Sequence, residues 1–390
     1  MEKIPVITET TASQPRTGPR AGIRTAADDV GTEVVGTRPV HQRPCPGGWR
    51  DCDLNVRAVL GSGRGIAHRR LTPARSMPGE LAQYVGGFDC GRLFGGRLRS
   101  SCRELALRSA RQGGSVLCED GRMPRFTSYD GTTLSYSVAG RGPALVCLAG
   151  GPGADVRDLG RLGGLDGFRT LVMLDARAAG RSEVPSDRAS CAFTEQARDL
   201  EELRRRLEIE RLDVVAHSAG TLTAQAFAAD HPEKLGKLVL ITPAGLVSRE
   251  VDEVEVAAIR ARRADEPGSA EALAAGAQPW SYGAWSDTTR RHHEAEATYP
   301  QPPSWLRDAF YVRPASEAAA ATEVARRAAV LSPVLVVAGS EDGVAGVRAA
   351  RRVASCYPVG RLEVLAGCGH WPWIDEPTAF RELVSGFLDG

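Results

Sequence analysis

Short apolar runs alternate with amphipathic stretches along residues 124–390. The apolar runs are typical of buried parallel strands and lie at 143–150, 170–176, 212–218, 237–243, 333–340 and 361–367. Apolar residues recur three or four positions apart, as in amphipathic helices, at residues 194–210, 219–230 and 347–357 and in the last residues of the chain. Ahead of them, residues 125–140 predict a β-hairpin that turns at Asp130 and Gly131. This alternation predicts an α/β fold with a doubly wound, mostly parallel sheet.

The alternation stops between residues 248 and 331, which are rich in Ala, Glu and Arg and contain no strand-like run. An insertion of this kind between two strands predicts a helical cap over the carboxyl ends of the strands, where such folds bind ligands. We therefore expect one α/β core in two parts, residues 123–247 and 332–390, separated by a cap at 248–331.

Residues 1–122 mix Gly, Pro and Arg without sustained periodicity, so they cannot bury enough apolar surface to offset the loss of chain entropy. They predict a disordered extension, or an over-extended reading frame whose natural start is Met123. This segment has 19 Lys and Arg against 12 Asp and Glu, whereas the remaining residues have 30 against 36. A basic tail can hold nucleic acid, but no aromatic residues are interleaved with these charges, and we expect no nucleic-acid partner.

No apolar run reaches the roughly 20 residues that cross a bilayer, and the first residues lack the apolar region of a secretory signal. We therefore expect a cytoplasmic protein without a membrane partner, whose nine cysteines are free thiols. The pairs Cys45/Cys52 and Cys90/Cys102 lack the C-x-x-C spacing of zinc sites. The sequence predicts neither a metal nor a cofactor.

Ser218 stands where the strand at 212–218 turns into the following helix, in the stretch "AHSAG". A nucleophile on such a tight turn needs small residues two positions away on each side, and here these are Ala216 and Gly220. The usual pattern is G-x-S-x-G, so Ala216 is a departure of one methyl group. A serine there can also be a simple helix N-cap, and its companions decide between the two roles.

A serine hydroxyl needs a general base, and the base needs an acid that orients it. Of the seven histidines only His370 lies on a loop just after a late strand. His217 should project away from the serine and pack, and the cap residues His292 and His293 should be solvated. The acid should follow the strand at 333–340, where Asp342 is placed better than its neighbour Glu341.

An acyl-transfer site also needs two backbone N–H groups that stabilise the developing oxyanion. One should be that of Ala219, directly after the nucleophile. The other should come from "LAGGPG" after the strand at 143–150, where glycines allow a close backbone approach, and we assign it to Gly151.

The segments "AGGPG", "DARAAGRS", "AHSAG", "GSED" and "GCGHWPWIDEP" resemble the α/β-hydrolase superfamily, and within it the proline-iminopeptidase-like branch. The resemblance covers residues 124–390 and implies an α/β-hydrolase fold with Ser218, Asp342 and His370 as its triad. The sequence departs from that branch at Ala149, which replaces a histidine, and at Ala178, which replaces a glycine.

The resemblance implies release of N-terminal residues from small peptides or amides, which requires carboxylates around a free ammonium group. The cap offers acidic residues for this, but such residues usually form a solvated face, and they are Glu250, Asp252, Glu253, Glu255, Glu294 and Glu296. Four aromatic residues could line an apolar pocket or pack in the core, and they are Trp280, Tyr282, Trp285 and Trp305. Two alternatives stay open: an esterase or thioesterase acting on a small metabolite, and a non-catalytic binding protein. The expected partner is a small molecule or short peptide, and the sequence leaves substrate-binding residues and oligomeric state undetermined.

Overall fold

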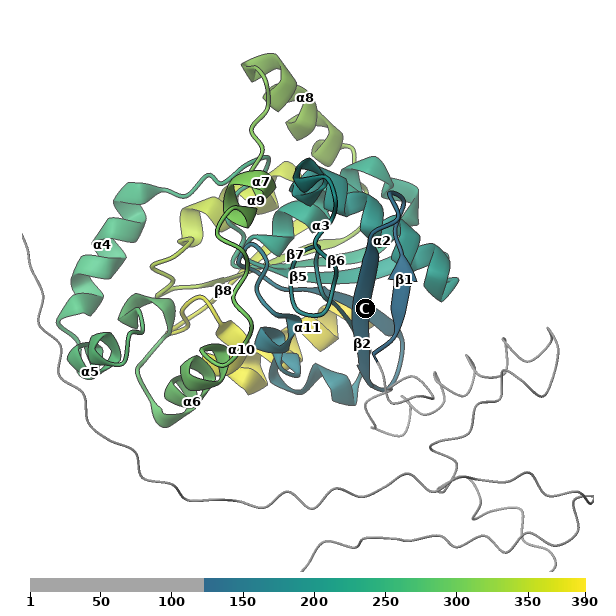
Figure 1. Cartoon of the computed structure of the whole chain (residues 1–390). Coiled ribbons are helices and arrows are strands. Elements are labelled where there is room, and N and C mark those ends of the chain that lie inside the picture. Colours follow the sequence, from purple (N-terminus) through teal and green to yellow (C-terminus); the bar gives the residue numbers. More distant parts are fainter. Residues whose placement is uncertain (1–122) are drawn as a thin grey trace, which may run out of the picture. The chain divides into compact units, whose positions relative to one another are not determined.

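An eight-stranded sheet organises residues 123–390, which are the residues that this computed structural model describes (Figure 1). The strands follow the order β1-β2-β4-β3-β5-β6-β7-β8. The pairs β1–β2 and β2–β4 are antiparallel, and all other neighbours are parallel. The doubly wound, mostly parallel sheet is therefore confirmed, whereas the predictions for residues 1–122 lie outside the described residues.

The strands agree with the apolar runs of the sequence to within a few residues. They are β1 (Arg125–Thr127), β2 (Thr133–Gly140), β3 (Ala144–Leu148), β4 (Thr170–Leu174), β5 (Leu212–His217), β6 (Leu235–Ile241), β7 (Val334–Gly339) and β8 (Gly360–Leu365). The predicted hairpin is formed by β1 and β2, whose register pairs Arg125 with Ser135.

Helices cover both faces of the sheet because successive side chains of each strand point to opposite sides. In β3, Val146 and Leu148 belong to the core under α2 (Phe193–Leu207), α3 (Gly220–Asp230) and α9 (Val347–Cys356). Leu145 and Cys147 face the other core, under η4 (Leu162–Gly167), α10 (Pro372–Asp375) and α11 (Pro377–Asp389). Short 3-10 turns complete the connections at η3 (Val156–Leu159), η5 (Arg188–Cys191) and η6 (Pro232–Lys234).

All regular secondary structure between β6 and β7 is helical (Figure 1). It contains α4 (Glu253–Ala264), α5 (Ser269–Ala274), η7 (Pro279–Ser281), α6 (Asp287–Glu296), α7 (Leu306–Phe310) and α8 (Glu317–Ala328). It contacts the loops after three strands: the N–H of Gly343 donates to the Trp280 carbonyl, that of His370 donates to the Ser281 carbonyl, and Gly153 packs against Leu306. This segment thus covers the carboxyl ends of the strands.

A buried arginine ties the hairpin to the sheet. The Arg177 side chain is fully buried, with ion pairs to Asp130 in the hairpin loop and to Asp199 on α2. Because a buried guanidinium needs a full set of acceptors, this network fixes the loop after β4 relative to β1 and β2. The next residue, Ala178, has a positive φ of 58°, which glycine would adopt at lower cost. Among the described residues, no helix has both the length and the apolar composition that a membrane span requires.

Candidate active site

Ser218 sits on a sharp turn between β5 and α3. Its φ is +49°, in the left-handed region that non-glycine residues rarely adopt, and its N–H donates to the Ile241 carbonyl at 2.9 Å. A Cβ atom at Gly220 would collide with the Ala149 carbonyl oxygen, which explains the small residue two positions after the serine. Strained backbone of this kind occurs where the surrounding structure holds a functional side chain in place.

His370 and Asp342 meet at the ends of β8 and β7. His370 Nδ1 lies 2.9 Å from Asp342 Oδ2, and both side chains are almost completely buried. The other carboxylate oxygen accepts the N–H groups of Val344 at 2.8 Å and Ala345 at 3.1 Å. Burial alone would raise the pKa of the Asp342 carboxyl, but the charge and hydrogen bond of His370 and these two N–H groups bring it below its ordinary value. The carboxylate is therefore ionised and can orient the imidazole.

His217 supports the loop that carries His370. Its Nε2 lies 3.0 Å from the His370 carbonyl oxygen, to which Thr242 Oγ1 also donates at 3.1 Å. The two imidazoles pack with their centroids 4.7 Å apart. Burial, together with repulsion from His370, lowers the pKa of His217 to about 3, so this ring is neutral and donates through Nε2. His217 packs, as predicted, but its ring lies against His370 rather than projecting away from the site.

The structure thus joins two of the three predicted triad residues directly. Ser218 is the neighbour of His217 and is partly exposed, but within residues 123–390 no hydrogen bond joins its hydroxyl to His370. Hydrogen bonds between nucleophile and base are often long in structures without substrate. The alternative acid, Glu341, points elsewhere and pairs with Arg262 and Arg263 of α4.

The predicted oxyanion groups belong to the loop after β3 and to the turn that carries Ser218. Gly151 has a φ of +110°, a conformation that suits glycine alone, and Gly150 lies so close to the Ser218 side chain that a Cβ there would be 2.9 Å from it. Ala219 is the N-cap of α3, where backbone N–H groups have no partner within the helix. Over the described part of the chain, neither Gly151 nor Ala219 donates its N–H to another group.

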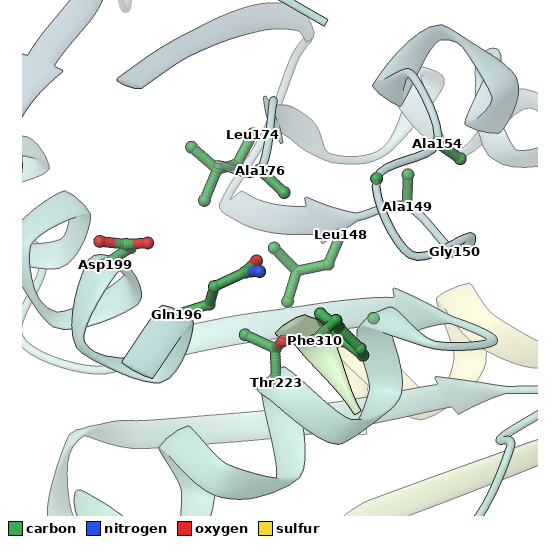
Figure 2. A pocket seen from close by; sticks show the side chains of 12 residues that line it. Leu148, Ala149, Gly150, Ala154, Leu174, Ala176, Gln196, Asp199, Thr223 and Phe310 are labelled. Atoms are coloured by element: carbon green, nitrogen blue, oxygen red, sulfur yellow. The ribbon is translucent and has the colours of Figure 1, made fainter. Parts of the chain in front are cut away.

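Two hollows adjoin the "LAGGPG" loop, and they differ in size. One, behind Ala149 and Gly150, has a volume of about 30 Å³, and Figure 2 shows Gln196, Thr223 and Phe310 around it. That volume holds about one water molecule. The other has a volume of about 360 Å³, within the range of small-molecule sites. It opens beside Gly151 and Pro152 and is bounded by the segment Tyr299–Ser304 and by Arg307, Asp155, Asp158 and Glu296.

A buried cluster of polar side chains forms one wall of the larger pocket. Asp158, on η3, lies with its Oδ1 3.2 Å from His292 Nε2, and its Oδ2 accepts from Trp371 Nε1 at 3.1 Å. His292 Nδ1 lies 2.9 Å from the Tyr282 hydroxyl. Burial and the nearby Asp158 charge raise the pKa of Glu296. Burial would raise the pKa of Asp158 and lower that of His292, but their mutual attraction shifts both the opposite way.

The structure corrects the prediction for His292 and shows which of the cap acids and aromatic residues line a pocket. His292 is not solvated, because Tyr282 and Trp371 enclose it. Of the six cap acids only Glu296 lines the larger pocket. The four cap aromatics line neither hollow. Tyr282 stacks on Trp371, and Trp285 packs beside Tyr282. The other two are half-exposed and lie against arginine side chains: Trp280 against Arg260 and Trp305 against Arg188. No sequence pattern identified Asp158 as a residue of this pocket.

Asp375 ties the loop of His370 to the cap. Its Oδ2 accepts the N–H of Gly369 at 2.8 Å and that of Gly283 at 2.9 Å. Burial raises the pKa of Asp375 to about 6 although both hydrogen bonds lower it. The structural role expected for Asp375 agrees with these contacts.

Comparisons with known proteins agree with this architecture. A family model described as the alpha/beta hydrolase fold matches residues 143–377. An uncharacterised protein of Mycobacterium tuberculosis is 28% identical over 286 residues, which are 68% of this chain and 81% of that protein. Proline iminopeptidase of Lactobacillus delbrueckii subsp. bulgaricus is 27% identical over 273 residues, covering 63% of this chain and 89% of the enzyme.

The fold likewise recurs among solved structures. An esterase from Rhodococcus sp. ECU1013 superimposes with a TM-score of 0.55 at 22% identity, covering 69% of this chain and 98% of the esterase. At this identity the likeness concerns the fold alone.

Proposed function

The chain belongs to the α/β-hydrolase fold family, and from this premise we propose that it is a serine hydrolase that releases N-terminal residues from small peptides or amides, as proline iminopeptidases do. The observation that carries the proposal is the Asp342–His370 pair beside the strained Ser218 elbow. The carboxylate-lined pocket at Gly151 supports the finer, aminoacyl part of it.

The chemistry proceeds in two halves. His370 Nε2 takes the proton of the Ser218 hydroxyl as Oγ attacks the carbonyl carbon of the substrate, and Asp342 stabilises the imidazolium through Nδ1. The N–H groups of Gly151 and Ala219 hold the oxyanion of the tetrahedral intermediate. The carbon–nitrogen bond then breaks, the leaving amine receives the proton from His370, and an acyl-enzyme remains on Ser218. Water, deprotonated by His370, releases the acid and restores the serine.

The acidic wall of the pocket supports an aminoacyl substrate. Asp158 and Glu296 both line it, and their carboxylates can hold the α-ammonium of a substrate whose carbonyl reaches Ser218. A charge-assisted contact in a partly dry pocket is stronger than one in water, so it favours a free amine over a blocked one.

The test compares L-proline p-nitroanilide with its N-acetyl form. We expect kcat/KM to be at least about 100-fold higher for the free amine, which corresponds to about 2.7 kcal/mol. Glu296→Gln should remove most of this preference, while Glu294→Gln, at an exposed position on the same helix, should keep it. Equal rates on both anilides, or a preference for an uncharged p-nitrophenyl ester, would favour the esterase or thioesterase alternative instead. If none of these substrates is turned over, a non-catalytic binding protein is the remaining alternative.

A further inference from the structure

Three side chains with metal-binding atoms converge beside the larger pocket. Asp158 lies on η3, while His292 and Glu296 lie four residues apart on α6, so that one helix face presents both. One carboxylate oxygen from each acid and one imidazole nitrogen all lie within 4.8 Å of one another. His292 Nε2 and Asp158 Oδ1 are 3.2 Å apart.

The buried oxygen of Asp158 lacks a hydrogen-bond donor. Its Oδ1 is shielded from solvent and accepts no hydrogen bond, and the Asp158 side chain is only 3% exposed. His292 Nε2 is nearby but directs its hydrogen bond, 3.3 Å long, to the Asp158 backbone carbonyl. A buried anionic oxygen without a donor is costly, and a cation at this point would satisfy it.

A second layer of groups holds the cluster in orientation. When a metal ion replaces the proton on Nε2, the Tyr282 hydroxyl, 2.9 Å from His292 Nδ1, can accept the proton that Nδ1 carries. Trp371 Nε1 donates to Asp158 Oδ2 and so leaves Oδ1 for a cation. Ligating histidines and carboxylates in metal sites have such partners as a rule.

We propose that Asp158 Oδ1, His292 Nε2 and a Glu296 carboxylate oxygen bind a divalent transition-metal ion, with Zn²⁺ as the best match. Zinc takes imidazole and carboxylate ligands at about 2.0–2.2 Å, and tetrahedral bonds of that length separate two ligand atoms by about 3.4 Å. The 3.2 Å between Nε2 and Oδ1 is close to this value, and the Glu296 oxygen lies within 4.8 Å of the other two ligand atoms. The pocket that Asp158 and Glu296 line gives the ion its entry path and an open fourth position.

Metal binding has a consequence that rests on the proposed function. The two carboxylates that would attract a substrate ammonium are the same two that would bind the ion, so zinc and the substrate compete for them. Zinc should therefore inhibit hydrolysis of L-proline p-nitroanilide in competition with the substrate, and should affect an uncharged p-nitrophenyl ester far less.

The experiment titrates the full chain with ZnCl₂ in an isothermal calorimeter. We compare the wild type with Asp158→Asn, His292→Gln and Glu296→Gln, and with Glu294→Gln as the matched control. The expected result is one saturable site that each ligand substitution weakens at least about 10-fold and that the control retains. Because Asp158 is buried, far-UV circular dichroism checks each fold, and the partly exposed Glu296 supplies a variant that should fold normally.

Two results overturn the site: no saturable binding by the wild type, or equal affinity in all folded variants, which would assign the zinc to other thiols and imidazoles. Failure of the proposed function looks different. In that case proline p-nitroanilide is not hydrolysed, while the calorimetric site and its loss in Glu296→Gln remain.

Discussion

The Asp375 carboxylate makes stability depend on pH in a direction opposite to that of most carboxylates. It accepts two backbone N–H groups, one from the His370 loop and one from the cap, in a site that is mostly shielded from water. Burial raises its pKa from 3.8 to about 6. An unfolded aspartate titrates near 3.9. Between these two values the folded protein binds more protons than the unfolded chain, so rising pH lowers the free energy of unfolding.

The size of the effect follows from the shift. About two pKa units correspond to about 3 kcal/mol, which is fully present below pH ~4 and lost as the pH rises through ~6. Asp375→Asn keeps an oxygen acceptor for both N–H groups and never ionises, so this component disappears. Between about pH 4.5 and 7.5 the stability of the variant relative to wild type should therefore rise by about 2 kcal/mol.

Urea denaturation at these two pH values, followed by circular dichroism, measures the difference. Glu376→Gln changes a carboxylate at the exposed neighbouring position and should show no comparable change. If the difference between wild type and Asp375→Asn is the same at both pH values within about 0.5 kcal/mol, the carboxylate ionises without penalty and the reasoning from burial is wrong.

Two further predictions concern the triad. Ser218→Ala should abolish labelling by a fluorophosphonate and lower turnover by several orders of magnitude, because no other group replaces the nucleophile; labelling that survives would reject the assignment. Asp342→Asn should leave the circular dichroism spectrum intact and reduce kcat by about 10⁴-fold through a wrongly oriented imidazole, whereas Glu341→Gln should have little effect, since Glu341 pairs with arginines of α4; the reverse order would transfer the role to Glu341.

Most of the sheet and the turn at Ser218 could be predicted from the sequence, because each of them depends on a short stretch of residues. An apolar run between turn residues is enough to predict β5. A small residue is required at position 220 because a Cβ atom there would collide with the Ala149 carbonyl oxygen. Their positions on loops directly after late strands then selected His370 and Asp342, and the structure places His370 Nδ1 2.9 Å from Asp342 Oδ2.

The polar residues beside the larger pocket could not be predicted from such local patterns. The helix at Asp287–Glu296 is polar on all sides, and a helix of that kind usually lies in solvent. His292 is shielded only because Tyr282, ten residues earlier, and Trp371, on the loop after β8, pack on it. Asp158 comes from a short turn without any motif. The spacing of His292 and Glu296 was the one available signal, since it places both on one helix face.

The path of the chain through the sheet also sets when the site can exist during synthesis. Strands β5 and β6 pair early and can form the Ser218 turn, but β7, with Asp342 after it, follows only after the whole cap has been made, and His370 comes after β8. Pairing β6 with β7 closes a long loop, which costs entropy and slows the step. If Ser218 and His370 act as proposed, a nascent chain has its serine without the base until β8 and the loop after it have been made. The proposed hydrolytic activity would then arise together with the closure of the core.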